Sequence, residues 1–384
     1  MSALLSSHPD TLGSQATLTI DLGALAANWQ LLRQQGGAAE CGAVIKADAY
    51  GIGLEPAARA LQTAACRTFF VAHVSEALRA RAALGSDPFC IVYVLNGLLP
   101  EPGLVDLYRA HDLRPVLGSL DDVERWQDEG SGLAAAIHVD TGMNRLGLSL
   151  EELRQLAAKH AAGTLGFPIS LLMSHFISSE IADSTLNARQ IATFDTARSI
   201  LPDVPGSLCN SSGLFLSGKP VHDLTRPGYA MFGGNPTPDA PNPMRPVVHL
   251  SARILRLREI ATGETAGYNA QWTAKRPTRL GVIGVGYADG LPRNAMATDA
   301  HSGGEAIVAG VRCPFAGRVS MDLTIIDITD VPLVDVRVGM PVELLGSTIS
   351  VDDLGQRADT IGYEILTNLG ARYHRVYVDD AGSP

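Results

Sequence analysis

One lysine stands where a buried strand is expected to end. Lys46 follows the apolar run CGAVI (residues 41–45), so we expect its ammonium group to be partly desolvated. Desolvation lowers the pKa of a lysine and makes the free amine available as a nucleophile. The plainer alternative is a lysine whose stem lies along the rim while its charge reaches water. Position alone leaves both interpretations open.

Further polar side chains follow the later apolar runs. They are an acid and an arginine of one loop, a serine with a histidine, an asparagine with a serine, and a second arginine: Asp140, Arg145, Ser174, His175, Asn210, Ser211 and Arg226. Together with Lys46, this set would suit an aldehyde cofactor that carries a phosphate, bound beside a substrate carboxylate. Convergence at one place does not by itself identify the cofactor.

The elements that must position these residues are short apolar runs that alternate with helical segments. Eight runs occur, at residues 41–45, 68–72, 89–95, 113–117, 133–139, 169–174, 206–209 and 223–230. Ser149 to Glu152 form a capping box that predicts the start of one helix. Apolar strands alternating with helices indicate a parallel sheet, and eight such units favour a (β/α)₈ barrel. The active site of such a barrel lies at the carboxyl ends of its strands.

A proline-rich segment separates this region from a second one. Residues 236–246 contain five prolines, which predicts a linker. The runs beyond it are β-rich and separated by Gly, Pro and Asp, so we expect a mostly β C-terminal domain. The predicted organisation is an α/β chain with a (β/α)₈ barrel over 23–240 and a β-rich domain over 241–384. An alternating strand within residues 14–22 is expected to join the second domain.

The composition argues against several classes of protein. The 384 residues carry a formal net charge of −10 with no block of like charges, which disfavours nucleic acid and anionic membranes as partners. The opening residues 1–15 lack the pattern of a signal peptide, and no run is long enough to span a bilayer. Five scattered cysteines without a CxxC pair predict neither disulfides nor a structural metal. We therefore expect a cytoplasmic protein that holds no metal.

The residues around the lysine resemble a known signature. AVIKADAYG (43–51) resembles the cofactor-lysine signature of bacterial alanine racemases, which use pyridoxal 5′-phosphate (PLP). The resemblance covers nearly the whole chain, from TIDLGALAANW (19–29) to YEILTNLGARYHRVYV (363–378). It implies a PLP-dependent amino-acid racemase that interconverts L- and D-alanine. It also implies a homodimer with active sites shared between subunits.

The resemblance assigns a role to individual residues. It implies catalytic roles for Lys46, Tyr268, His175 and Arg226, and cofactor binding by Lys46, Tyr50, Asn210, Ser211, Arg226, Gly228, Tyr229 and Tyr363. It places Arg145, Met321 and Asp322 at the substrate. Lys46 and Tyr268 would act as bases on opposite faces, with His175 and Arg226 supporting the tyrosine. Each alone has an ordinary alternative, such as a surface ion pair for Arg145 or a core histidine for His175.

The chain departs from the family pattern near the expected pocket. His138 replaces a lysine, often carbamylated, that orients the arginine of the substrate loop, and a neutral histidine cannot replace that negative charge. Ile52, Asn269 and Ser320 replace a histidine, a glycine and a cysteine; asparagine tolerates the positive φ that glycine marks.

These departures leave open a serine or broad-specificity racemase, and a PLP-binding protein without turnover. A decarboxylase of the same architecture would need a glycine-rich phosphate loop and a cysteine motif that are not found. A PLP carrier would lack the β-rich domain. The sequence does not distinguish D-alanine supply for peptidoglycan from alanine catabolism.

Overall fold

The computed structural model describes residues 13–379, except residues 86 and 131. The expectation that residues 1–15 form no signal peptide falls mostly on residues 1–12, which lie outside the described residues. The chain forms two compact units. One spans Leu25–Arg245, and the other combines the residues up to Ala24 with those from Pro246 onward.

The first unit is built on short parallel strands. In chain order they are β2 (Glu40–Cys41), β3 (Ala43–Val44), β4 (Thr68–Val71), β5 (Ile91–Val94), β6 (Leu113–Leu117), β7 (Ala135–His138), β8 (Ile169–Met173), β9 (Gly206–Ser207) and β10 (Leu224–Thr225). Strands β3 to β9 pair in sequential order in one curled sheet, and each predicted apolar run contains or overlaps a strand. Because both faces of this sheet are covered, the strands are almost continuously apolar.

Backbone hydrogen bonds close the curled sheet into a barrel. Gly42 interrupts the first strand between β2 and β3, and its N–H donates to Thr225 O at 2.9 Å. β10 runs parallel to β2, and Val44 N–H donates to Pro227 O at 2.9 Å. On the other side of β10, Asp223 N–H donates to Gly206 O at 3.0 Å. The predicted eightfold barrel is therefore confirmed, with β10 as its eighth strand.

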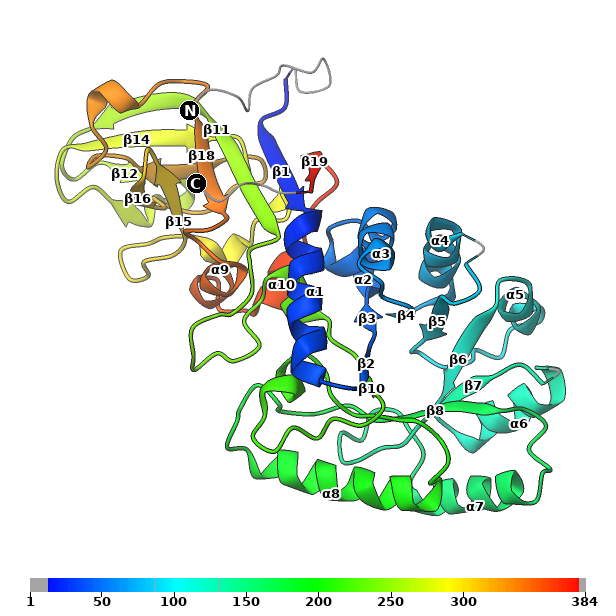
Figure 1. The fold of residues 1–384 in the computed structure, drawn as a ribbon. Helices are drawn as coiled ribbons and strands as arrows, with labels where there is room; N and C mark the ends of the chain where they lie inside the picture. Colours follow the sequence, from blue (N-terminus) through cyan, green and yellow to red (C-terminus); the bar gives the residue numbers. More distant parts are fainter. Residues whose placement is uncertain (1–12, 86, 131, 380–384) are drawn as a thin grey trace. The chain divides into compact units, whose positions relative to one another are not determined.

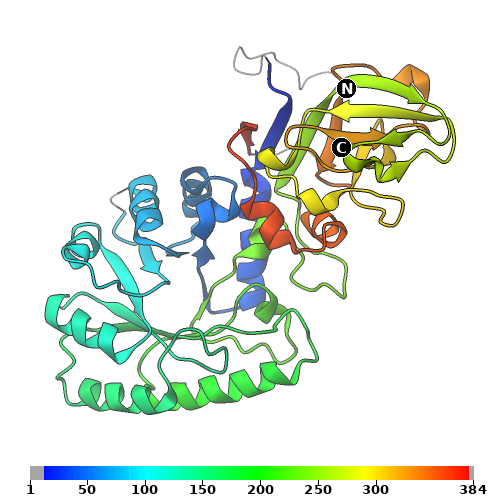
Figure 2. The same ribbon diagram turned by 180° about the vertical axis from the view of Figure 1, so that it is seen from behind.

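Helices follow most of the strands and cover the sheet (Figures 1 and 2). They are α1 (Leu22–Gly36), α2 (Lys46–Tyr50), α3 (Leu54–Thr63), α4 (Val74–Leu84), α5 (Leu104–Ala110), α6 (Leu120–Glu129), α7 (Leu150–Ala161) and α8 (Thr185–Ile200), with 3₁₀ turns η2 (Ser212–Phe215) and η3 (Tyr229–Phe232). The predicted capping box is confirmed: Glu152 N–H donates to Ser149 Oγ, and Ser149 N–H to Glu152 Oε2 at 2.8 Å. No helix within the described residues has the length and apolar character needed to cross a membrane.

The second unit is a largely antiparallel β structure. Its strands are β1 (Ala16–Asp21), β11 (Val248–Ile260), β12 (Thr265–Ala266), β13 (Trp272–Thr273), β14 (Thr278–Ile283), β15 (Glu305–Val308), β16 (Val311–Pro314), β17 (Thr324–Asp327), β18 (Pro341–Leu345) and β19 (His374–Val378). β1 lies between β11, to which it is antiparallel, and β19, to which it is parallel. Short helical elements connect the strands: η4 (Tyr268–Ala270), η5 (Tyr287–Asp289), η6 (Arg293–Ala295), η7 (Leu333–Asp335), α9 (Val351–Arg357) and α10 (Gly362–Thr367).

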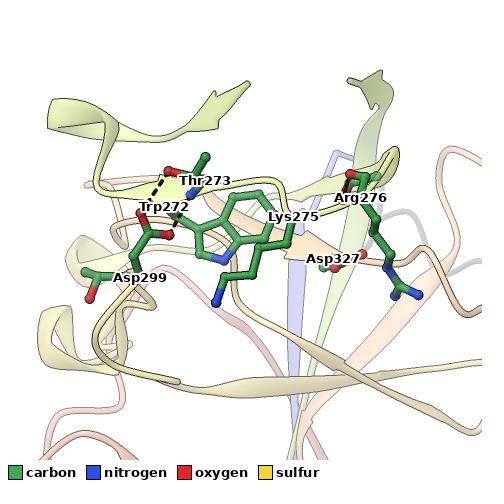
Figure 3. Close-up of a pocket in the computed structure, with 8 residues that line it drawn as sticks. Trp272, Thr273, Lys275, Arg276, Asp299 and Asp327 are labelled. Atoms are coloured by element: carbon green, nitrogen blue, oxygen red, sulfur yellow. Dashed lines mark hydrogen bonds between the residues drawn. The ribbon is translucent and has the colours of Figure 1, made fainter. Parts of the chain in front are cut away.

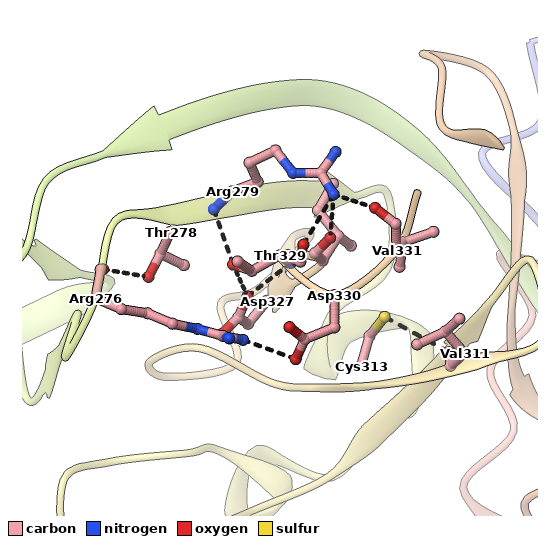
Figure 4. A network of polar contacts seen from close by, with 10 residues as sticks. Arg276, Thr278, Arg279, Val311, Cys313, Asp327, Thr329, Asp330 and Val331 are labelled. Carbon is pink, nitrogen blue, oxygen red and sulfur yellow. Dashed lines mark hydrogen bonds and ion pairs between the residues drawn. The ribbon is translucent and has the colours of Figure 1, made fainter. Parts of the chain in front are cut away.

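A polar network fastens the end of the β14–β17 pair (Figure 4). Arg279 donates from its guanidinium to Ile328 O, Thr329 O and Val331 O, and from its backbone N–H to Thr329 Oγ1 at 3.0 Å. Arg276 forms an ion pair with Asp330 at 2.7 Å. These contacts satisfy carbonyls of the turn after β17, which also buries the side chains of Ile328 and Val331.

Candidate active site

Lys46 leaves the barrel at the end of β3, as predicted. Ile45 N–H donates to Phe70 O at 2.8 Å, which ties this strand end to β4. Burial lowers the pKa of Lys46, the Arg145 guanidinium lowers it further, and the Glu76 carboxylate opposes both. A lysine in this environment supplies the neutral amine at lower pH than a surface lysine does.

The residues after Lys46 form a left-handed turn, although their sequence is typical of a right-handed helix. Ala47, Asp48, Ala49 and Tyr50 have φ values of 53°, 55°, 54° and 52°. An L-residue in this region costs roughly 1–2 kcal/mol, so four in a row are rare. Backbone strain of this kind concentrates at functional sites and needs support from the surrounding structure.

The left-handed turn directs Tyr50 into the barrel. The ring of Tyr50 stacks on Phe232, with centroids 4.6 Å apart. A Cβ atom added at Gly228 would lie 2.5 Å from the Tyr50 hydroxyl oxygen, so only glycine allows this approach. Tyr50 and Gly228 were both predicted as cofactor contacts, and the structure brings them together.

Backbone N–H groups converge beside this tyrosine. The N–H groups of Gly228 and Ala230 donate to Ser211 Oγ at 3.0 and 3.2 Å. We call Tyr50, Ser211, Gly228 and Ala230 the phosphate cradle, because backbone N–H groups beside hydroxyls are a common anion-binding arrangement. Ala230 was missed by the sequence analysis, since its N–H carries no side-chain signal.

Arg226 is buried in the middle of the barrel. It donates to Ser207 Oγ at 2.5 Å and to Ser174 O, and its Cζ lies 5.9 Å from the centroid of the Phe70 ring. Burial lowers the pKa of Arg226 to about 10, so the guanidinium stays charged at neutral pH. It has no carboxylate partner within the part of the chain that the structure describes. A buried cation with spare donors suits an acceptor such as a pyridine nitrogen.

Two histidines near Arg226 are held neutral. Burial lowers the pKa of His175 to about 3 and that of His138 to about 4, with Arg226 the next contribution in both cases. His138, which ends β7, therefore supplies no negative charge and no cation near Arg145. Arg145 itself is exposed and forms no ion pair with any described residue. The loop that carries Arg145 thus has no anion at the position where the resemblance implies one.

A hydrogen-bond network supports the strand ends around His175. Gln190 on α8 donates to Thr141 Oγ1 and to His175 O, both at 2.9 Å. Thr141 Oγ1 and Ser174 Oγ lie 2.8 Å apart. Asp140 directly precedes Thr141. Its Oδ1 accepts the N–H groups of Gly142 and Met143 at 2.9 Å, and these bonds shape the loop that leads to Arg145. Gln190 was missed because nothing in its helix distinguishes it by sequence.

Asn210 and Tyr229 flank the phosphate cradle. Asn210 Oδ1 accepts Ser179 Oγ and Gly213 N–H, both at 2.9 Å, so this oxygen holds the start of η2. The Tyr229 ring is buried against Gly234, where an added Cβ would lie 2.1 Å from the ring. Contact of either residue with a cofactor stays a prediction.

Tyr268 lies in the second unit, on a tight loop between β12 and β13. Its side chain is 66% exposed. Gly267, Asn269 and Ala270 have φ values of 78°, 62° and 49°. The expectation that Asn269 adopts the left-handed conformation is confirmed. A Cβ atom at Gly267 would lie 3.0 Å from Arg318 N, so the loop packs closely on the segment that leads to Met321.

The other predicted residues of the second unit are also at its surface. Met321 is 53% exposed, and its carbonyl accepts Ala288 N–H at 3.0 Å. Asp322 forms an ion pair with Arg372 at 2.9 Å. Tyr363 lies on α10 and is 40% exposed. The predicted site residues therefore divide into a barrel group and an exposed group on the β unit.

A surface pocket of about 290 Å³ lies next to the Tyr268 loop but contains none of the predicted residues. It is lined by Trp272, Thr273, Lys275, Arg276, Thr278, Thr298, Asp299 and Asp327 (Figure 3). Asp299 accepts the N–H and hydroxyl of Thr273 at 2.9 and 2.8 Å. Asp299 thus holds β13 in place as part of the pocket wall. The barrel residues that suit a cofactor do not line this pocket.

A parallel barrel that presents a desolvated lysine, a phosphate cradle and a buried arginine, in one chain with a β-rich unit, defines the class: a PLP-dependent enzyme of the barrel type. Comparison with known proteins makes the assignment specific. Residues 20–236 match the model of the alanine racemase N-terminal domain, and residues 247–377 match that of the C-terminal domain. The chain belongs to the alanine racemase family.

Individual relatives support this membership along nearly the full length. The chain is 55% identical to an alanine racemase of Methylobacterium nodulans, over 95% of this chain and 96% of the relative. It is 42% identical to a catabolic alanine racemase of Agrobacterium fabrum, over 97% and 94%. Among solved structures, an alanine racemase from Bartonella henselae with covalently bound pyridoxal phosphate is 36% identical, with a TM-score of 0.87 over 95% of this chain and all of that one.

Proposed function

We propose that this chain is an alanine racemase that interconverts L- and D-alanine with PLP, using Lys46 and Tyr268 as two bases. The observation that carries the proposal is the lysine of lowered pKa at the end of β3, on the same turn as the tyrosine of the phosphate cradle. Family membership specifies the substrate as a small amino acid, since the relatives bear the name alanine racemase.

The barrel residues suit the cofactor. Lys46 would hold its aldehyde carbon, the phosphate cradle its phosphate, and Arg226 its ring nitrogen. When bound, PLP supplies an electron sink for the negative charge that develops at the substrate Cα. Arg226 has donors and no acceptor, so it opposes protonation of the ring nitrogen and limits that sink. A carbanion stabilised only partly is reprotonated quickly, which favours racemisation over transamination.

The two bases act on opposite faces of the substrate. Lys46 takes or returns the Cα proton on one face, and burial, which lowers its pKa, favours the free amine that this role needs. Tyr268 does the same on the other face. A free tyrosine has a pKa of about 10, so it needs support from hydrogen bonds or positive charge. Neutral His175 can accept a hydrogen bond, and Arg226 supplies the charge.

The substrate carboxylate pairs with Arg145. This guanidinium is exposed and forms no ion pair with the described residues, so it is available for a ligand. Met321 and Asp322 would border the Cα substituent and keep the pocket small. Because enantiomers have equal free energy in water, the direction of reaction follows whichever enantiomer is consumed, as in peptidoglycan synthesis or alanine catabolism.

We further propose a cytoplasmic homodimer in which Tyr268 of the partner subunit reaches the site of Lys46. Tyr268, Tyr287, Met321 and Tyr363 are all at least 40% exposed, and aromatic residues and methionine are enriched at interfaces. The five cysteines are free and buried, as is usual for a reducing compartment.

Isotope exchange in D₂O tests the proposal. Wild-type protein with PLP should convert either enantiomer of alanine to the other and place deuterium at Cα. The Tyr268→Phe variant should form no inverted product, yet still exchange the Cα proton of the one enantiomer whose proton faces Lys46. Tyr377→Phe, an exposed tyrosine of the same unit, is the control.

Three results would count against parts of the proposal. Continued inversion by Tyr268→Phe would exclude two bases. If a substrate panel showed faster turnover of serine than of alanine, the assigned substrate would be serine instead of alanine. Covalent PLP on Lys46 without exchange of any amino acid would leave a binding protein without turnover.

A further inference from the structure

Helix α4 contacts the turn that follows Lys46. Glu76 lies in the first turn of α4, where Oε2 accepts the N–H groups of Ala72 at 2.8 Å and His73 at 3.2 Å. These bonds cap the helix. The other carboxylate oxygen of Glu76 takes no part in the cap. This oxygen, Oε1, accepts the N–H of Ala47 at 2.6 Å. That N–H belongs to the residue directly after Lys46.

The turn needs such a support because its backbone is strained. Residues 47–50 all have left-handed φ values, and such a conformation persists only where surrounding contacts maintain it. Arg79, one turn along α4, adds a second tie through Asp48 Oδ1 at 2.6 Å. The side chains of this ion pair are 46% and 42% exposed, so we expect its contribution to be small.

The turn sets two features of the site together. Its first end carries Lys46, and its last residue, Tyr50, reaches Gly228 in the phosphate cradle. We propose that Glu76 is a positioning residue, whose carboxylate holds Ala47 N–H so that Lys46 and Tyr50 face the aldehyde and phosphate ends of one cofactor. The inference rests on the proposed function and extends it to a residue outside the predicted site.

The charge of Glu76 also affects Lys46. The groups that act on the lysine are Arg145 from the loop after β7, His175 after β8, and Glu76 from α4. His175 is neutral at neutral pH, so Glu76 is the charge that opposes Arg145. Without it, the pKa of Lys46 falls further. The pH at which the amine captures PLP should then move downward.

The chain offers a matched control in Glu152. It caps α7 through Ser149 with the same capping box and lies in the same unit, but it makes no bond to the Lys46 turn. The two changes differ in what a single amide oxygen can keep. Both bonds to the Glu152 side chain end on Oε2, so Glu152→Gln can retain them, whereas Glu76 uses both of its oxygens, so Glu76→Gln cannot keep the cap and the Ala47 bond together.

The experiment titrates the full chain, stripped of cofactor, with PLP. Glu76→Gln should weaken PLP binding about tenfold or more, as expected for a lost charge-assisted hydrogen bond, and shift the pH profile of PLP capture downward. Glu152→Gln should change the melting temperature little and leave PLP affinity and the pH profile as in wild type. Equal PLP affinity and equal pH profiles in both variants would overturn the proposal.

A second variant separates the effect of the position of the carboxylate from the effect of its charge. It also replaces Glu76→Gln in the test if that variant does not fold. Glu76→Asp keeps the charge but shortens the reach, so it should weaken PLP binding and leave the pH profile in place. Wild-type affinity in Glu76→Asp would contradict the positioning role. A wild-type chain that never captures PLP at Lys46 would instead overturn the proposed function, and the role of Glu76 with it.

Discussion

Arg226 keeps its positive charge in an interior where cations are rarely buried. Its guanidinium donates at two points, to Ser207 Oγ and to Ser174 O, and these contacts fix its plane. A lysine cannot reproduce this geometry, because an ammonium is a point charge and loses its proton readily when it is buried. The electronic role proposed for Arg226 depends on that difference.

We predict that Arg226→Lys raises side transamination. A neutral amine at this position would oppose protonation of the cofactor ring less strongly, so the substrate carbanion would live longer. The ratio of pyruvate formed to alanine racemised should increase, roughly tenfold if the change is worth about 1.4 kcal/mol. Arg33→Lys, a surface change on α1, is the control. An unchanged ratio would mean that Arg226 does not act on the ring.

The buried histidines predict how stability depends on pH. Their folded pKa values, about 3 for His175 and about 4 for His138, lie below the ordinary value of about 6.5. The unfolded chain therefore binds more protons below pH 6.5. Stability is complete above that pH and is lost on acidification, at up to roughly 1.4 kcal/mol per pH unit for each histidine.

Urea unfolding between pH 7 and pH 5 should show this loss. In His138→Gln the slope should be shallower by the contribution of one histidine, about 1 kcal/mol per pH unit. His111→Gln, at an exposed position, is the comparison. A slope identical in wild type and His138→Gln would mean that His138 takes up its proton as easily in the folded protein as in the unfolded chain.

At the scale of elements, the sequence predicts those features that depend on residues close together in the chain. The barrel strands contain or overlap the eight apolar runs, because burial on both faces demands apolar residues in each strand. Lys46, His175 and Arg226 were found because they come at strand ends. The left-handed turn could not be predicted, since Ala-Asp-Ala-Tyr favours an ordinary helix and the support comes from Glu76 on another helix. Tyr268 was predicted by resemblance alone.

The left-handed turn leads us to predict that a glycine substitution at Ala47 will not destabilise the protein. In Ala47→Gly the new residue adopts φ of 53° without steric cost, so the folded chain should keep or gain stability, by up to about 1 kcal/mol. Ala192→Gly, at an exposed position inside α8, should instead destabilise by about 1 kcal/mol. Unfolding free energies of the two variants test this contrast. Equal losses would argue against a left-handed conformation at Ala47.

At the scale of the molecule, the proposed bases belong to different compact units. Lys46 is in the barrel unit, and Tyr268 is exposed on the β unit. In a symmetric dimer a residue on one surface can complete a site on the other subunit twice over, once in each direction. A shared site would explain why the tyrosine proposed as a base is exposed in a single chain.

Mixing two inactive variants tests this arrangement. Lys46→Ala and Tyr268→Phe should each lack racemase activity, but a mixed dimer would contain one site with an intact Lys46 and the partner's intact Tyr268. Co-expression, or dissociation and reassociation of the mixture, should therefore restore activity, limited to one working site per mixed dimer. If each chain supplied both bases to its own site, every site in the mixture would lack one base, and no activity would return.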